Sequence, residues 1–385
     1  MPGPAPDVAV IGGGIVGTAT AAFLVEAGLS VRLYERAAIA AGASGRNSGI
    51  VQHPFDPVMA DLYRRSVEEY RRLGAASDGG FRLPDEPAGL LLVGRDIDRA
   101  GDAADQWAAA WPGTRPEILS GPALRTLEPS LAPDLVAVRL EIGFLVAPAA
   151  ATEAFAASAR RHGAEVWLAA DASVNVADGR AVGVRVGDGI EAAGSVVVAA
   201  GPWTPALVDP SGSWSPIRPS WGVVASLTLP AAPRHGLEAI DIDIEPDEGR
   251  RPPGPEAAAT REPTESGVDF SLIPAAGSSA LGSTFLMDEP DPEQWIDALR
   301  RNGSRYVPAV ATAPLVGTRS CARPMSRDGR PFVGGVPSVA GLWVIAGHGP
   351  WGISTGPGSA RLLVDRMQGK GRDPIPAALA VNRFG

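Results

Sequence analysis

Glycines at three positions near the N-terminus have the spacing of a dinucleotide-binding turn. Gly12, Gly14 and Gly17 fit the pattern GxGxxG. The first glycine permits a tight turn, the second lets the backbone approach a pyrophosphate, and the third lets the next helix pack closely on the strand. The N–H groups at the start of that helix would then face the phosphates. A purely structural turn between a strand and a helix can contain the same glycines.

The segments around these glycines favour nucleotide binding. The apolar run Val8–Ile11 predicts a buried strand, Thr18–Ala27 predicts a helix, and Val31–Tyr34 predicts a second strand. Glu35 ends the second strand, about 20 residues after the glycines, where an acidic residue accepts hydrogen bonds from an adenosine ribose. The sequence therefore predicts a βαβ unit that binds a dinucleotide. The motif alone does not separate FAD from NAD, so a nicotinamide-dependent dehydrogenase is the alternative at this stage.

Three segments, residues 7–50, 195–204 and 318–366, resemble the D-amino-acid oxidase superfamily. This family includes glycine oxidase, monomeric sarcosine oxidase and D-amino acid dehydrogenase, and its members use FAD to oxidise C–N bonds. Small hydrogen-bonding residues fill Gly42–Ile50, which directly follows the predicted βαβ unit. Val196–Trp203 resembles a strand of the family's flavin domain, and Leu342–Gly349 resembles its closing strand and loop. The resemblance favours FAD over NAD.

The resemblance also implies which residues bind FAD. They come from the glycine turn, the end of the second strand, the block after it and three later segments. They are Gly12, Gly14, Ile15, Val16, Gly17, Glu35, Arg36, Ser44, Arg46, Asn47, Ser48, Gly49, Ala200, Gly201, Trp203, Cys321, Gly347, His348, Gly349, Gly352 and Ile353.

Cys321 is the only cysteine of the chain. Its spacing from Met325 and Asp328 resembles that around the cysteine that links FAD covalently in monomeric sarcosine oxidase. A lone cysteine is more commonly a buried packing residue. We therefore expect noncovalent FAD, with attachment through Cys321 as the alternative.

Four residues are candidates for contact with the substrate. Arg323 lies in a segment resembling the family pattern xRPxxxDGxP, in which the arginine binds the substrate carboxylate. A planar guanidinium suits this task because it binds a carboxylate through two hydrogen bonds, although a structural ion pair is the alternative. His348 and Trp351 lie in the loop expected near the flavin ring. His348 would orient the substrate or stabilise negative charge on the flavin, and His53 is a further candidate wall residue.

The chain departs from the family at one functional position. Sarcosine oxidases use a lysine near the flavin to activate oxygen, whereas Lys370, near the C-terminus, is the only lysine here. Oxygen and a separate electron acceptor therefore both stay open as the oxidant.

The order of these segments predicts an α/β protein with two domains. We expect a discontinuous, Rossmann-like FAD-binding domain and a smaller α+β substrate domain built on an antiparallel sheet. The expected FAD-binding domain comprises residues 1–84, 141–212 and 318–385, and the substrate domain comprises 85–140 and 213–317. Residues 245–267 are rich in Pro, Glu, Gly and Arg and are expected to form a mobile loop.

Composition excludes some classes of partner. The net charge of −9 argues against a nucleic-acid partner. The N-terminus lacks the basic start of a secretion signal, and no run of 18 apolar residues predicts a transmembrane helix. The single cysteine fits a reducing compartment, so we expect a cytoplasmic protein with no metal site.

The resemblance implies FAD-dependent oxidation of a small amino acid or secondary amine. The substrate would pass a hydride to flavin N5, and the resulting imine would hydrolyse. Two alternatives remain. Hydroxyglutarate dehydrogenases also resemble the Ser44–Gly49 block, which favours a 2-hydroxy acid as the substrate. The missing lysine favours a flavin-binding subunit that relays electrons within a complex.

Overall fold

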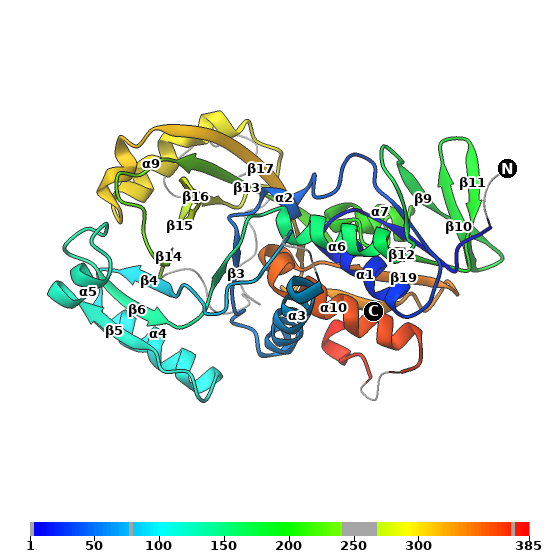
Figure 1. Cartoon of the computed structure of the whole chain (residues 1–385), viewed down its shortest axis with the longest axis horizontal. Helices are drawn as coiled ribbons and strands as arrows, with labels where there is room; N and C mark the ends of the chain where they lie inside the picture. Colours follow the sequence, from blue (N-terminus) through cyan, green and yellow to red (C-terminus); the bar gives the residue numbers. More distant parts are fainter. Residues whose placement is uncertain (1–3, 77–79, 241–267, 371–373, 385) are drawn as a thin grey trace.

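The computed structural model describes residues 4–76, 80–240, 268–370 and 374–384. These residues form two lobes, each built on its own large β-sheet (Figure 1). The predicted loop 245–267 lies outside the described residues, so its mobility stays a prediction. The mixed architecture is the α/β fold that the sequence predicts.

The first lobe contains a six-stranded sheet whose strands are short and, apart from the edge strand β8, mainly apolar and buried. Its order is β18 (Phe332–Gly335), β19 (Leu342–Ala346), β12 (Ser195–Val198), β1 (Val8–Ile11), β2 (Val31–Tyr34) and β8 (Glu165–Trp167). All neighbouring strands are parallel except β18, which runs antiparallel to β19. A parallel sheet must be covered on both faces, which explains why its strands are continuous apolar runs.

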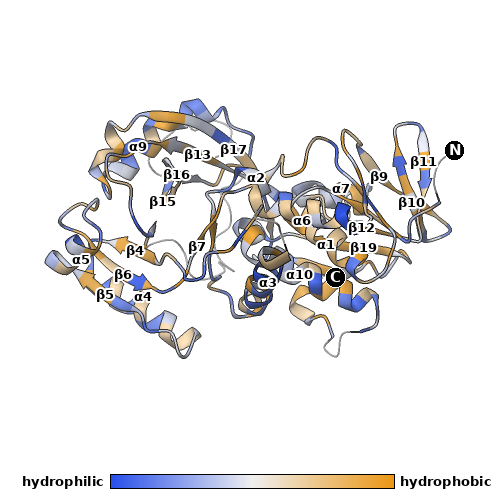
Figure 2. Cartoon of the chain, in the orientation of Figure 1, coloured by the Kyte–Doolittle hydropathy of each residue, from blue (hydrophilic) through white to orange (hydrophobic). Residues whose placement is uncertain are grey.

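Helices cover one face of this sheet, and a small sheet covers the other. The helices are α1 (Ile15–Glu26), α3 (Pro57–Ala76), α6 (Ala150–Arg161) and α10 (Gly352–Met367). They share one apolar core with β1 and β2, in which Phe23 of α1 meets Phe155 of α6 edge-on. Figure 2 colours these elements by residue hydropathy. The small antiparallel sheet contains β9 (Ala172–Ala177), β10 (Arg180–Val186) and β11 (Gly189–Ala192) and packs on the outward side chains of β1 and β12. The predicted βαβ unit is confirmed.

The second lobe contains an eight-stranded sheet. Its order is β17 (Leu315–Ser326), β13 (Ile217–Leu227), β16 (Ser278–Thr284), β15 (Val268–Ala275), β14 (Gly236–Ala239), β4 (Leu90–Gly94), β6 (Val136–Leu140) and β5 (Glu117–Ser120). Neighbours are antiparallel apart from the pair β14 and β4. Helices α4 (Ile97–Ala110), α5 (Gly121–Leu127) and α9 (Ile296–Ser304) pack against this sheet. The predicted antiparallel sheet is present.

Short elements complete the described parts of the two lobes and of the segments between them. They are α2 (Ala43–Arg46), β3 (Ile50–Val51), β7 (Phe144–Leu145) and α7 (Thr204–Val208), with single 3-10 turns at 201–203, 292–295, 308–311, 349–351 and 377–379. Strand β17 pairs with β13 from Leu315 to Ser326, so the domain boundary predicted at residue 318 falls inside a strand. A boundary that follows the sheets would lie after Ser326. The division into domains otherwise stays a prediction.

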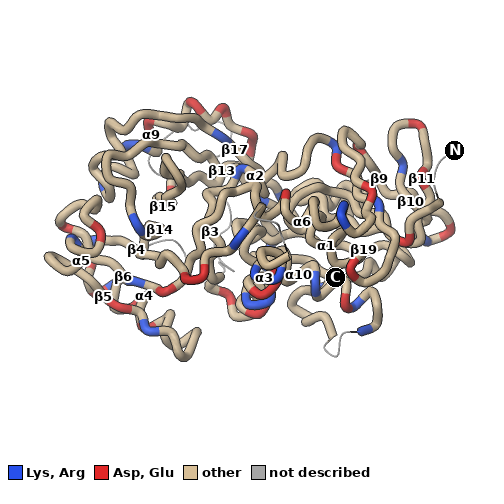
Figure 3. Tube along the Cα trace, viewed as in Figure 1, with Lys and Arg blue, Asp and Glu red and all other residues tan. Residues whose placement is uncertain are grey.

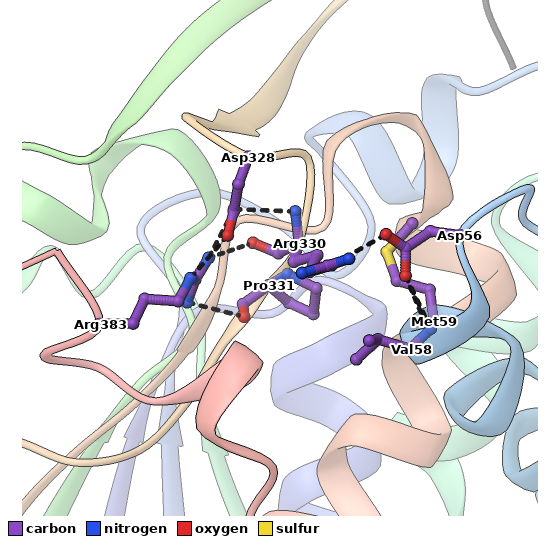
Figure 4. Close-up of polar contacts among 7 residues, drawn as sticks. All are labelled: Asp56, Val58, Met59, Asp328, Arg330, Pro331 and Arg383. Atoms are coloured by element: carbon purple, nitrogen blue, oxygen red, sulfur yellow. Dashed lines mark hydrogen bonds and ion pairs between the residues drawn. The ribbon is translucent and has the colours of Figure 1, made fainter. Parts of the chain in front are cut away.

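Partly buried ion pairs hold the turn between β17 and β18 against the C-terminal segment and against the residues before α3. Arg383 donates to both carboxylate oxygens of Asp328 at 2.8 Å, and Arg330 donates to Asp56 at 2.8 Å (Figure 4). Asp328 therefore has a structural role, because it holds the C-terminal segment against the β17–β18 turn.

Charged side chains of both signs are interspersed over both lobes (Figure 3). Among the described residues, no helix combines the length and the apolar character needed to cross a bilayer.

Candidate active site

A cavity of about 790 Å³ lies where the two sheets approach each other. Its volume falls within the range of about 300–1,000 Å³ that is typical of ligand sites. One side is formed by the glycine turn, residues 42–52 and the segments after β12 and β19. The other side is formed by strands β13–β17 of the eight-stranded sheet. The cavity therefore has one wall from each lobe.

The glycine turn needs its glycines for the reasons that the motif predicts. Gly12 has a φ of +116°, which residues with a side chain rarely adopt, and a Cβ there would overlap the carbonyl of Ala199. A Cβ at Gly17 would overlap the carbonyl oxygen of Gly12. Gly17 does not line the cavity; its part is to let α1 pack against the turn. The turn thereby brings the first residues of α1 to the cavity wall.

The start of α1 is suited to a phosphate. Gly14, Ile15 and Val16 line the cavity, and the first turn of the helix contains no acidic residue. The Ile15 N–H donates to Ser44 Oγ at 2.9 Å, while the first N–H groups of any α-helix lack acceptors within the helix. With the helix dipole, these groups form a site for an anion.

Glu35 lies at the end of β2 with its carboxylate fixed by the backbone. Its Oε2 accepts from the Gly13 N–H at 2.6 Å, and its Oε1 accepts from the Ala37 N–H at 2.8 Å. Each oxygen keeps a lone pair for a further donor, such as a ribose hydroxyl. The guanidinium carbon of Arg36 lies 3.8 Å from the centre of the Trp203 ring. Glu35, Arg36 and Trp203 all line the cavity. This end of the cavity fits the nucleoside part of a dinucleotide.

The 42–50 block is rigid because its polar groups bond to each other and to β17. Asn47 Nδ2 donates to the carbonyls of Ala43 and Ser44, and its Oδ1 accepts from the Gly49 N–H. Arg319 of β17 donates to the carbonyls of Arg46 and Asn47 at 3.1 and 3.0 Å. Ser44, Arg46, Asn47, Ser48 and Gly49 all line the cavity, so this block joins the two lobes at the cavity wall.

Arg323 is a half-buried guanidinium on β17 that lines the cavity. It donates to the Thr284 carbonyl at 2.7 Å and to Ser283 Oγ, and it lies 4.5 Å from the ring of Phe285. Both acceptors are neutral, and among the described residues these two bonds leave three of its five N–H donors for an anion. Burial lowers its pKa, although the charge of Asp269 opposes that shift. A Cβ at Gly222 would overlap the guanidinium, so this glycine lets the side chain cross β13.

His348 lines the cavity and is almost completely buried. Its Nε2 lies 3.1 Å from Ser359 Oγ on α10. Burial lowers the pKa of His348 to about 3, so the imidazole is neutral at physiological pH. A neutral ring can orient a group through a hydrogen bond, but it does not place a positive charge beside the expected flavin.

The buried neutral state of His348 predicts a loss of stability in acid. An unfolded histidine binds a proton near pH 6.5, whereas folded His348 does so only near pH 3. The free energy of unfolding should therefore fall by up to about 1.4 kcal/mol per pH unit between these values. We expect His348→Gln to reduce this slope in urea unfolding between about pH 5 and pH 7.5. His162→Gln, at an exposed histidine, should not change it, and equal slopes for His348→Gln and the wild type would contradict a buried neutral ring.

Other predicted residues divide into two groups. Trp351, Ala200, Gly201, Trp203, Cys321, Gly349, Gly352 and Ile353 line the cavity. Gly347 and His53 do not. His53 Nδ1 lies 2.6 Å from the Pro54 carbonyl oxygen, and its ring packs against Tyr63, Trp107 and Trp111. The structure therefore places His53 in an aromatic cluster behind the wall, which corrects its assignment as a wall residue.

Gln52 and Glu238 are among the polar residues of the cavity wall that sequence reasoning missed. Gln52 follows β3, and Glu238 lies in the four-residue strand β14. No motif marks either position. The one sequence feature that indicates Glu238 is that it interrupts a short apolar segment between Leu237 and Ala239. Lys370, the only lysine of the chain, is exposed beyond α10 and does not line the cavity.

Comparisons with known proteins agree with this geometry. The model of the DAO family, described as FAD dependent oxidoreductase, matches residues 7–366. A glycine oxidase of Pseudomonas aeruginosa is 28% identical over 97% of this chain and 98% of its own length. The crystal structure of glycine oxidase from Bacillus cereus is 25% identical, with a TM-score of 0.79 over 95% of this chain and 96% of that one. Iminodiacetate oxidase from Chelativorans has the same fold, with 22% identity and a TM-score of 0.80 over 97% of this chain and 98% of that one.

Proposed function

Because the chain belongs to the DAO family of FAD-dependent oxidoreductases, we propose that it oxidises the C–N bond of a small amino acid or secondary amine in this cavity. The N-terminal turn, Glu35 and the 42–50 block would bind FAD, and the strands of the eight-stranded sheet would hold the substrate. We further propose that the two large sheets mark an FAD-binding domain and a substrate domain.

Arg323 is the observation that carries this proposal. It is a half-buried guanidinium at the cavity wall, and the acceptors that it binds among the described residues, the Thr284 carbonyl and Ser283 Oγ, are both neutral. The charge of Asp269 acts on this guanidinium, but the two hydrogen bonds that Arg323 donates go to neutral groups, so a ligand anion would add a direct partner for the cation. A substrate carboxylate is the anion that suits the planar fork, through two parallel hydrogen bonds. The relatives that are named glycine oxidase agree with a small amino acid.

The protein would act mainly by holding the substrate in position. Bound FAD supplies the hydride acceptor at flavin N5. Arg323 would fix the carboxylate and thereby the direction of the Cα–H bond. Trp221 and Trp351 line the cavity and would exclude water from the reacting carbon. The substrate loses a hydride from Cα and a proton from nitrogen, and water hydrolyses the resulting imine to a carbonyl compound and an amine.

The environment of Cys321 supports noncovalent FAD. The thiol is buried, and burial raises its pKa although the nearby Arg323, Arg319 and Arg46 oppose the shift. A thiol that keeps its proton is a poor nucleophile for attack on the flavin. We expect acid precipitation to release all flavin into the supernatant and Cys321→Ser to retain a full complement of FAD. Flavin that stays in the pellet of the wild type but not of the variant would contradict this.

The oxidant stays open between oxygen and a separate acceptor, since no lysine lines the described cavity. Oxygen consumption measured against reduction of an artificial dye would separate the two. The cytoplasmic location also stays a prediction.

Product analysis tests the proposed reaction. The holoenzyme would be incubated with glycine, sarcosine and both enantiomers of alanine, and in parallel with glycolate and lactate. We expect a 2-oxo acid together with ammonia or methylamine from at least one amino acid. Turnover of the hydroxy acids alone would favour the 2-hydroxy acid alternative. Failure of every compound would favour the electron-relay alternative.

A further inference from the structure

Gln52 and Glu238 form a polar pair inside an otherwise largely apolar part of the cavity. Glu238 of β14 is 9% exposed and Gln52 is 7% exposed, and both line the cavity. The Gln52 Nε2 donates to the two carboxylate oxygens of Glu238 at 3.2 and 3.3 Å. The Gln52 N–H donates to Ser354 Oγ, which fixes Gln52 against the start of α10.

This pair has more hydrogen-bond acceptors than the described residues satisfy. Gln52 Oε1 has no hydrogen-bond partner among them, and the Glu238 carboxylate has only the shared donor of Gln52. Burial raises the pKa of Glu238 to about 7, although the Gln52 hydrogen bond opposes the shift. A buried carboxylate without a cation destabilises the folded protein, which makes it a candidate for ligand binding.

The pair lies close to the proposed carboxylate site. Glu238 of β14 pairs with Ser271 of β15, and Ser271 pairs with Gly282 of β16. Ser283 is the next residue of β16 and binds the Arg323 guanidinium. Only β15 therefore lies between the strand of Glu238 and the strand that Arg323 reaches, and neighbouring strands are about 4.8 Å apart. A carboxylate and a guanidinium thus face one cavity from nearby strands.

We propose that Gln52 and Glu238 bind the amino group of the substrate while Arg323 binds its carboxylate. This assignment rests on the proposed function and makes the substrate an amino acid in preference to a 2-hydroxy acid. An ammonium group has three N–H donors and a positive charge, which suit the free oxygen of Gln52 and the Glu238 carboxylate. A hydroxyl has one donor and no charge, so it would leave acceptors unpaired.

A matched pair of unreactive ligands tests this assignment. 2-Aminoisobutyrate and pivalate differ only in an ammonium group in place of a methyl group, and neither has a hydrogen on Cα. Their binding to the holoenzyme would be titrated through the change in flavin absorbance, without turnover. We expect Glu238→Gln to weaken 2-aminoisobutyrate binding about 10- to 100-fold and to leave pivalate binding nearly unchanged. Glu238→Asp, which keeps the charge, should retain part of the preference.

Glu128→Gln is the control, because Glu128 is a buried carboxylate outside the cavity that bonds to His235. It should leave the ratio of the two affinities unchanged. If Glu238→Gln weakens both ligands equally, or neither, the amino-group assignment is wrong while the proposed function stands. If the wild type turns over an amino acid but neither ligand competes with that amino acid for binding, the amino-group assignment fails and the proposed function stands. If the wild type binds neither ligand and also turns over no amino acid, the proposed function fails as well.

Discussion

Replacing Arg323 with lysine lowers kcat/KM for a small amino acid by about 30- to 5,000-fold, because the substrate carboxylate loses its bidentate partner. Removal of one member of a buried, hydrogen-bonded charge pair costs about 2–5 kcal/mol, which corresponds to this range. Lysine keeps the charge but not the planar fork, so it should not restore activity. The measurement is steady-state turnover by the holoenzyme, with the flavin content of each variant determined first.

Two comparisons separate a substrate contact from a general loss of structure. Oxidation of an amine without a carboxylate should change little in the Arg323 variant, because it makes no use of the guanidinium. Arg218 is exposed on the adjacent strand β13 and outside the cavity, so Arg218→Gln should have no effect. Gly222→Ala should reproduce part of the defect, since its Cβ would displace the guanidinium. An Arg323→Lys enzyme with unchanged kcat/KM for amino acids would disprove the assigned role.

Replacing Gly17 with alanine should weaken FAD binding by about 10²-fold or more. The new Cβ would overlap the Gly12 carbonyl oxygen, which belongs to the backbone and cannot move away without displacing the turn. Overpacking of this kind costs about 1–3 kcal/mol or more, and it would also move the start of α1 away from the phosphates. Titration of the apoprotein with FAD, followed by flavin fluorescence, measures the change.

Gly101 provides a matched control for Gly17. Both glycines lie within helices, but no atom lies within 4 Å of a Cβ added at Gly101. Gly101→Ala should therefore stabilise the protein by about 0.5–1 kcal/mol through helix propensity and leave FAD affinity unchanged. If the Gly17 variant binds FAD as well as the Gly101 variant does, close packing at the turn is not what positions the phosphate site.

The parts of the site that the sequence predicts are those that depend on local backbone geometry. Gly12, Gly14 and Gly17 specify the turn through their missing side chains, and Glu35 follows from its position at the end of β2. Short-range patterns of this kind are readable because each residue's role depends on its neighbours in the chain. The same holds for the apolar runs that form the parallel sheet.

The parts that could not be predicted depend on contacts between distant segments. Gln52 and Glu238 meet across 186 positions of sequence, and neither residue belongs to a motif. His53 follows directly after Gln52, but packing against Trp107 and Trp111 turns it away from the cavity. The sequence also does not show that β17 forms the edge of the second sheet beside β13 and that it brings Cys321 and Arg323 to the cavity.

Anaerobic reduction of the bound flavin tests the central claim most directly, because it needs no assumption about the oxidant. The holoenzyme would be mixed without oxygen with a small amino acid and, separately, with the matching 2-hydroxy acid. The account predicts that the visible flavin absorption is lost with at least one amino acid, faster than with its hydroxy counterpart, and that Arg323→Lys slows this loss. Purified protein that binds no flavin, or bound flavin that no amino acid or amine reduces, would contradict it.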